Sequence, residues 1–174
     1  GCWNIFFGYE TGVEELAKNI LTNKKNRDFE KMKRISRWTR EAGIETRAGF
    51  LVGLPGETPE LAKKTIQTAI DLDPDYAQFT VCCPYPGTKL ADEIHEGKWG
   101  KFLTHDLEEY NMWKVTWLPF GYKNAEELKN MERYAFRKFY LRPSYIIRRI
   151  LAIRSFEDIK RYIKGATALV KGFL

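Results

Sequence analysis

The chain has 174 residues, 44% of them hydrophobic and 14% aromatic, which is enough apolar material for one globular domain with a substantial core. No apolar run approaches the roughly 18 residues of a membrane span, and the N-terminus lacks the order of a signal peptide. The three cysteines, two of them adjacent, fit neither a disulfide framework nor a C-x-x-C metal knuckle, and they favour a reducing, cytoplasmic location.

The net charge of +6 is concentrated in the C-terminal part of the chain. Residues 131–174 hold eleven Lys and Arg against three acidic residues, which leaves the first 130 residues slightly acidic. The chain begins without Met, directly on the apolar run GCWNIFFG. We therefore expect a segment of a longer protein that carries a basic tail.

The first part of the chain alternates strand and helix patterns. The aromatic run from Trp3 to Phe7, closed by Gly8, predicts a strand buried on both faces. Helical periodicity follows over 13–21 and 28–41, and Gly43 suits the position after a helix end.

A second strand is predicted from Glu45 to Val52, followed by a turn over 53–58. Thr58 can cap the next helix, and Pro59 suits its first position, where a missing N–H costs nothing. This helix is predicted to end near Leu72.

A third strand, Tyr76 to Cys83, a turn and a short helix complete three β-α units. Crossovers of about two dozen residues or more are typical of parallel strands. We therefore predict an α/β fold with a parallel sheet over residues 1–97, an irregular connection over 98–123 and a basic helical extension over 124–174. Helical patterns within the extension cover 125–140, 144–153 and 156–170.

The turn after the second strand, GLPGET, places glycines where the main chain turns sharply and a ligand can approach it closely. No Gly-Lys-Ser/Thr follows, and the G-x-G-x-x-G spacing is absent, so neither a P-loop nor a dinucleotide-binding turn is indicated. An ordinary strand-to-helix loop is the alternative that these residues leave open.

Three segments resemble, in order and spacing, the radical S-adenosylmethionine enzymes. GFLVGLPGET, residues 49–58, resembles their fifth-strand motif, whose glycine-rich end borders the adenosine of the cofactor. FFGYETG, residues 6–12, resembles the fourth-strand motif, and FTVCCPYPGTKLADE, residues 79–93, the sixth strand of the cobalamin-dependent class. The tail, FRKFYLRPSYIIRRIL at 136–151, is similar to that of anaerobic magnesium-protoporphyrin monomethyl ester cyclases.

This resemblance implies half of a TIM-type barrel, its fourth to sixth strands, with a helical C-terminal extension. The parent enzyme would cleave S-adenosylmethionine to a 5′-deoxyadenosyl radical for oxidative cyclisation or methylation of a small molecule, with a tetrapyrrole as one candidate. S-adenosylmethionine and a [4Fe–4S] cluster are the implied cofactors, with cobalamin in the parent. Because C-x-x-x-C-x-x-C is absent here, we expect the cluster ligands, the N-terminal half-barrel and the cobalamin domain outside this chain, which alone should be inactive.

The resemblance also assigns cofactor-binding residues, but no catalytic or metal-ligating ones. Glu10 would bind a ribose hydroxyl, with a helix cap as the alternative, and Thr11 would shape that turn. Lys25 lies where the family sometimes offers a cation to the cofactor carboxylate. Glu57, shifted by one position from the family pattern, is predicted to support its loop. The adenosine would be bordered by Gly49, Leu51, Gly53 and Val81, although Leu51 also suits a barrel core.

The Arg-rich helix at 144–153 has three interpretations: it covers the barrel, it lies on an anionic membrane surface, or it binds an acidic substrate or nucleic acid. Nucleic acid is not expected, since no binding motif is recognised. Exposed sheet edges favour a homo-oligomer. The alternative function is a free-standing, non-catalytic α/β module that binds a ligand or a membrane surface.

Overall fold

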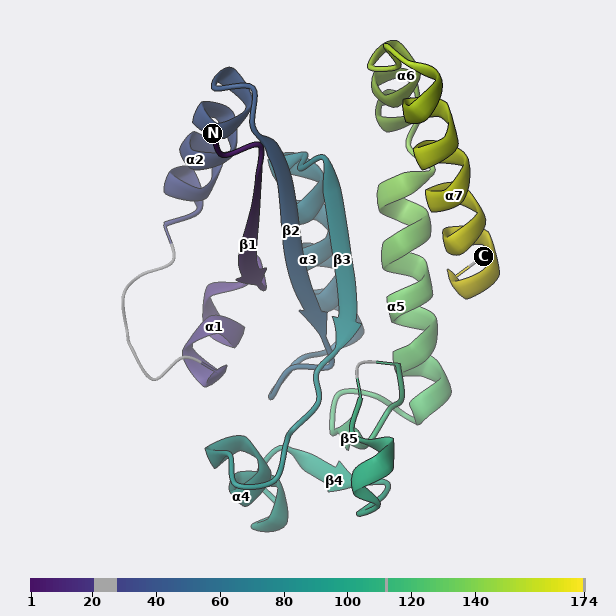
Figure 1. Cartoon of the computed structure of the whole chain (residues 1–174). Coiled ribbons are helices and arrows are strands. Elements are labelled where there is room, and N and C mark those ends of the chain that lie inside the picture. Colours follow the sequence, from purple (N-terminus) through teal and green to yellow (C-terminus); the bar gives the residue numbers. More distant parts are fainter. Residues whose placement is uncertain (21–27, 112, 174) are drawn as a thin grey trace.

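A three-stranded parallel sheet forms the centre of the molecule (Figure 1), with the spatial order β1 (Asn4–Glu10), β2 (Glu45–Val52) and β3 (Tyr76–Val81). The computed structural model describes residues 1–20, 28–111 and 113–173. Pairing is continuous between β2 and β3, whereas β1 shifts register between Gly8 and Glu10. The predicted α/β fold with parallel strands is confirmed.

The connections between the strands hold α1 (Glu14–Ile20), α2 (Phe29–Glu41) and α3 (Pro59–Leu72). Side chains cap two of these helices: the Asp28 carboxylate accepts a hydrogen bond from the Lys31 N–H at 3.1 Å, and the Thr58 hydroxyl accepts one from the Leu61 N–H at 3.4 Å. The predicted helix starts are therefore confirmed.

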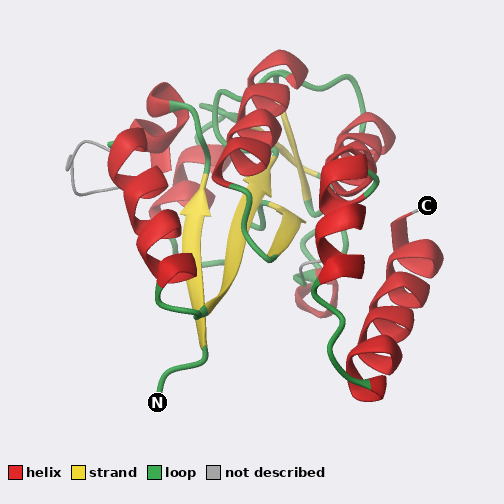
Figure 2. Ribbon diagram, turned by 90° about the horizontal axis from the view of Figure 1, so that it is seen from above, coloured by secondary structure: helices red, strands yellow, loops and turns green. Residues whose placement is uncertain are grey.

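Helices cover one face of the sheet (Figure 2). On that face Phe50 and Phe79 stack with their ring centroids 5.6 Å apart, and Phe79 also meets Phe139 of the C-terminal extension. These contacts form the main core, because alternate residues of each strand point to the same side.

We call the other side of the sheet the open face; its paired rows are Phe6, Arg47 and Tyr76, then Gly8, Gly49 and Gln78, then Leu51 and Thr80. Phe6 is 56% exposed, and Gly8, Arg47 and Gln78 are exposed as well. The prediction that the first strand is buried on both faces is wrong. Within this chain its aromatic residues alternate between core and solvent.

The connection at 98–123 is more regular than predicted. After α4 (Lys89–His95), the short strands β4 (Gly100–Phe102) and β5 (Trp117–Pro119) form an antiparallel pair, with a 3₁₀ turn at Leu107–Glu109 between them. Three-residue strands are too short to produce a readable period in the sequence.

The C-terminal extension consists of α5 (Ala125–Tyr140), α6 (Pro143–Leu151) and α7 (Phe156–Phe173), close to the predicted ranges. Helix α5 packs against β3 and α3, and α7 runs alongside α5 (Figure 1). In the part of the chain that is described, no helix combines the length and apolar character needed to cross a membrane.

Candidate functional site

A row of small residues crosses the open face, where Gly8 pairs with Gly49. A Cβ at Gly49 would lie 2.9 Å from the Phe6 ring, and one at Gly8 would lie 2.6 Å from Oε1 of Glu10. The glycines therefore leave room for two side chains that fold over the sheet. A ligand at Gly49 requires the exposed Phe6 ring to rotate away.

Glu10 ends β1 in the left-handed region, with a φ of 59°. This backbone conformation is costly for a residue with a side chain and occurs often at functional sites. The following residue, Thr11, is buried; its hydroxyl shares a hydrogen bond of 2.8 Å with Thr65 of α3 and accepts one from the Val13 N–H at 3.1 Å. The Thr11 side chain thus shapes the turn and faces α3, away from the open face.

Glu57 belongs to the turn that follows β2, and its side chain is fully buried. Its Oε1 accepts hydrogen bonds from the Gly53 N–H at 2.5 Å and from the Tyr122 hydroxyl at 2.7 Å. Burial raises the pKa of Glu57 to about 7, although both hydrogen bonds act in the opposite direction. The predicted role of Glu57 as a support of this loop agrees with these contacts.

Gly53 itself has a φ of 75°, and a Cβ there would lie 2.9 Å from the Leu128 side chain. Glycine is therefore needed at this position for both its conformation and its packing. The main-chain geometry of the turn depends on Gly53 and Glu57 together.

The end of β3 is held by a second buried contact. The indole N–H of Trp117, which is fully buried, donates a hydrogen bond of 2.8 Å to the Cys82 carbonyl. Val81 is buried as well, and Leu51 is half-buried against the cluster that contains Leu54 and Trp117. Leu51 therefore has a core contact at the position where adenine is expected.

The sequence interpretation missed Tyr122 and Trp117. Tyr122 is 65 residues from Glu57, and Trp117 is 35 residues from Cys82. Aromatic residues in a connection without periodicity gave no signal that they reach two strand ends.

Comparisons with known proteins identify the relatives of the chain, although no protein-family model matches it. An uncharacterised methyltransferase of Pyrococcus horikoshii is 30% identical over 95% of this chain and 34% of that protein. The anaerobic magnesium-protoporphyrin IX monomethyl ester cyclase of Rubrivivax gelatinosus is 30% identical over 84% of this chain and 25% of the cyclase.

Among solved structures, the radical S-adenosylmethionine methyltransferase TsrM of Kitasatospora setae, with cobalamin and a [4Fe–4S] cluster bound, has a TM-score of 0.51 and 31% identity. The match covers 56% of this chain and 19% of TsrM. The resemblance to radical S-adenosylmethionine enzymes is confirmed. The chain spans about a third or less of the length of these relatives.

The described residues do not provide a ligand set for the iron-sulfur cluster of a radical S-adenosylmethionine enzyme. Cys2 is exposed, Cys82 is buried and Cys83 is half-buried, and no group of three or more His, Cys, Asp or Glu side chains in the described residues could hold a metal ion. Lys25, the predicted partner of the cofactor carboxylate, lies outside the described residues.

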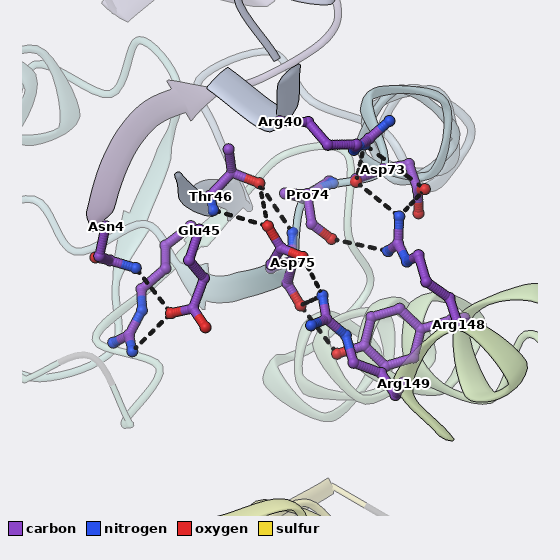
Figure 3. A network of polar contacts seen from close by, with 12 residues as sticks. Asn4, Arg40, Glu45, Thr46, Asp73, Pro74, Asp75, Arg148 and Arg149 are labelled. Carbon is purple, nitrogen blue, oxygen red and sulfur yellow. Dashed lines mark hydrogen bonds and ion pairs between the residues drawn. The ribbon is translucent and has the colours of Figure 1, made fainter. Parts of the chain in front are cut away.

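Arginines of α6 and of the residue before it bind the loop that leads into β3, at the amino ends of the strands (Figure 3). Arg149 donates to the Asp75 carboxylate at 2.5 Å, and Arg148 pairs with Asp73. Arg142, the residue directly before α6, donates to Asp73 at 2.9 Å. These contacts favour the interpretation that the basic extension covers the sheet, since these three arginines pair with acids of the same chain.

Proposed function

We propose that residues 1–97 are the C-terminal half of a radical S-adenosylmethionine barrel, with β1, β2 and β3 as its fourth to sixth strands. Residues 98–123 would connect this half-barrel to the extension at 124–174. The observation that carries the proposal is the one-sided covering of a parallel sheet: helices pack on one face, and the open face would line the barrel interior. The N-terminal half-barrel and a cobalamin domain of a larger protein would be its partners.

In this proposal the adenosine of S-adenosylmethionine lies at the carboxyl ends of the three strands, where ligands of such folds bind. Glu10 would accept a hydrogen bond from a ribose hydroxyl, and Lys25 would bind the cofactor carboxylate. The remaining contacts would come from the Thr11 turn, the surface of Gly49 and Leu51, and the main chain at Gly53 and Val81.

The cluster ligands and the cobalamin site are proposed for the larger protein, because the cysteines described above do not fit them. The reaction that we propose for that protein is methylation or oxidative cyclisation at an unactivated carbon of a small molecule by a 5′-deoxyadenosyl radical. A tetrapyrrole is a candidate substrate by analogy with the cyclase.

Titration calorimetry of S-adenosylmethionine into the chain tests the binding site. We expect Glu10→Ala to weaken binding at least tenfold. The matched control is Glu45→Ala, which removes a carboxylate at the amino end of the central strand β2, whereas Glu10 lies at the carboxyl end of β1. Equal affinities of the two variants would contradict the assignment of Glu10.

Reading the coding sequence upstream of Gly1 separates this proposal from a free-standing binding module. A C-x-x-x-C-x-x-C motif roughly 100 to 150 residues earlier, the span of three more β-α units, supports the radical enzyme. A start codon beside Gly1 supports the module. The isolated chain is expected to release no 5′-deoxyadenosine from S-adenosylmethionine, and such release would contradict the assignment of the cluster to another segment.

A further inference from the structure

We infer that the segment 117–122, comprising β5 and the turn after it, is a positioning element that fixes the carboxyl ends of β2 and β3 for ligand binding. The ligand part of this inference rests on the proposed function. We call the segment the strand-end clamp. It has no counterpart among the cofactor-binding residues that the sequence assigned.

The clamp holds the end of β2 through the Gly53 N–H, the first main-chain donor of this segment beyond the sheet. The last ladder contact between the strands is the hydrogen bond of 2.8 Å from the Cys82 N–H to the Val52 carbonyl. The next N–H along β2, that of Gly53, donates to Glu57, and the Tyr122 hydroxyl donates to the same carboxylate oxygen. Tyr122 thereby fixes the acceptor that orients Gly53.

The clamp holds β3 through the carbonyl of the residue that directly follows this strand, Cys82. Trp117 donates its indole N–H to the Cys82 carbonyl, directly after β3. Both donors come from one short segment. Trp117 binds a strand-end carbonyl directly, whereas Tyr122 acts on the Gly53 N–H through the Glu57 carboxylate, and the adenosine is proposed to bind at these strand ends.

Close backbone packing keeps the clamp in place. A Cβ at Gly121 would lie 1.9 Å from the Glu57 carbonyl oxygen, so the two backbones are in direct contact. Only glycine permits this approach. The clamp therefore meets the turn after β2 through the Tyr122 side chain and through its own main chain at Gly121.

The chemistry of Glu57 indicates a role beyond filling the core. Its second oxygen, Oε2, is buried and has no hydrogen-bond partner among the described residues. An apolar side chain would fill the same volume without the cost of a buried carboxylate. What Glu57 adds is an acceptor shared by Gly53 and Tyr122, which sets the geometry of the turn.

The test compares Tyr122→Phe with the matched control Tyr145→Phe. Both tyrosines are buried and donate one hydroxyl hydrogen bond, but Tyr145 donates to the Asp75 carbonyl, which precedes β3 at the amino end of the strand. Amide hydrogen exchange at Gly53 and titration of S-adenosylmethionine are measured for both variants, with urea unfolding to correct for global stability.

We expect Tyr122→Phe to accelerate exchange at Gly53 at least tenfold beyond its effect on global unfolding, and to weaken S-adenosylmethionine binding at least fivefold. Tyr145→Phe is expected to leave the exchange rate at Gly53 and the affinity for S-adenosylmethionine within twofold of the wild type after the same correction. Glu57→Gln, which keeps an amide oxygen as acceptor, should preserve Gly53 protection, whereas Glu57→Ala should remove it.

Unchanged relative exchange at Gly53 in Tyr122→Phe would overturn the clamp. Equal responses of the two tyrosine variants would also overturn it, because they would indicate a general stabilising role. If the wild-type chain does not bind S-adenosylmethionine, the proposed function is contradicted, while the exchange data still decide whether Tyr122 positions the strand end.

Discussion

The guanidinium of Arg149 lies 2.5 Å from the carboxylate of Asp75, which joins α6 to the loop before β3. Asp75 also accepts hydrogen bonds from the N–H and hydroxyl of Thr46, at 2.8 and 3.0 Å. Burial opposes the ionisation of Asp75, but the contacts with Thr46 and Arg149 outweigh it and lower its pKa. This carboxylate therefore stabilises the fold when ionised, and that stabilisation is lost as the pH falls through its lowered pKa.

Replacing Asp75 by Asn should destabilise the chain by about 1 to 3 kcal/mol at neutral pH, because Arg149 loses its charged partner in a largely buried site. Urea unfolding measures the change. The control is Glu14→Gln, which breaks the exposed pair with Lys18 and should cost less than about 0.5 kcal/mol. Equal losses would indicate that the α6 contact contributes no more than a surface ion pair.

Glu57 should make the chain less stable as the pH rises. Its pKa in the folded state is about 7, above its ordinary value of 4.5, so the folded state keeps a proton that the unfolded state releases. As the pH rises from about 4.5 to about 7, the free energy of unfolding should fall by about 3 kcal/mol in total, and it should stay low above pH 7. Urea unfolding at pH 5 and pH 8 measures the difference.

Glu57→Gln is expected to remove most of this pH dependence, since the amide does not titrate. A smaller decrease in the free energy of unfolding with rising pH should remain from Glu132, because burial also raises the pKa of this residue. If the wild type and Glu57→Gln show the same slope, Glu57 is already ionised at pH 5 and the stated pKa is wrong.

Gly121→Ala should destabilise the chain by at least about 2 kcal/mol, because the added methyl group collides with the backbone of Glu57. Gly165→Ala is the matched control, since a Cβ at this exposed position of α7 meets nothing within 4 Å in the described part of the chain. That substitution should stabilise the helix by about 0.5 to 1 kcal/mol. Denaturation of both variants gives the comparison, and a neutral Gly121→Ala would refute the close approach.

The isolated chain should self-associate through the open face and its edge strands, since exposed edges and an exposed aromatic residue promote pairing. Sedimentation equilibrium should give an average mass above the 20.4 kDa of the chain at high concentration. Phe6→Gln should shift the association toward monomer. Trp38→Gln, which changes an equally exposed aromatic residue on α2, should not. A monomeric wild type at all concentrations would contradict this expectation.

Much of the fold was predictable because it depends on local chemistry. The alternation of residues in Glu45–Val52, the cap at Thr58 and the helix start at Pro59 are properties of neighbouring residues, and the structure reproduces them. The strand-end clamp was not predictable in this way. Tyr122 and Trp117 act on partners far along the chain, and nothing in their immediate neighbourhood distinguishes them from ordinary core residues.

By itself, the sequence determined the parallel α/β order, the motifs of a radical S-adenosylmethionine enzyme and the glycines at the strand ends, since periodicity, turn chemistry and motif spacing are local. Only the tertiary structure decided that Thr11 faces α3, that Phe6 covers Gly49 and that Glu57 is shared by Gly53 and Tyr122. These contacts depend on which segments meet in space. The packing of helices on one face of the sheet and the return of the chain past the carboxyl ends of the strands determine which segments come into contact.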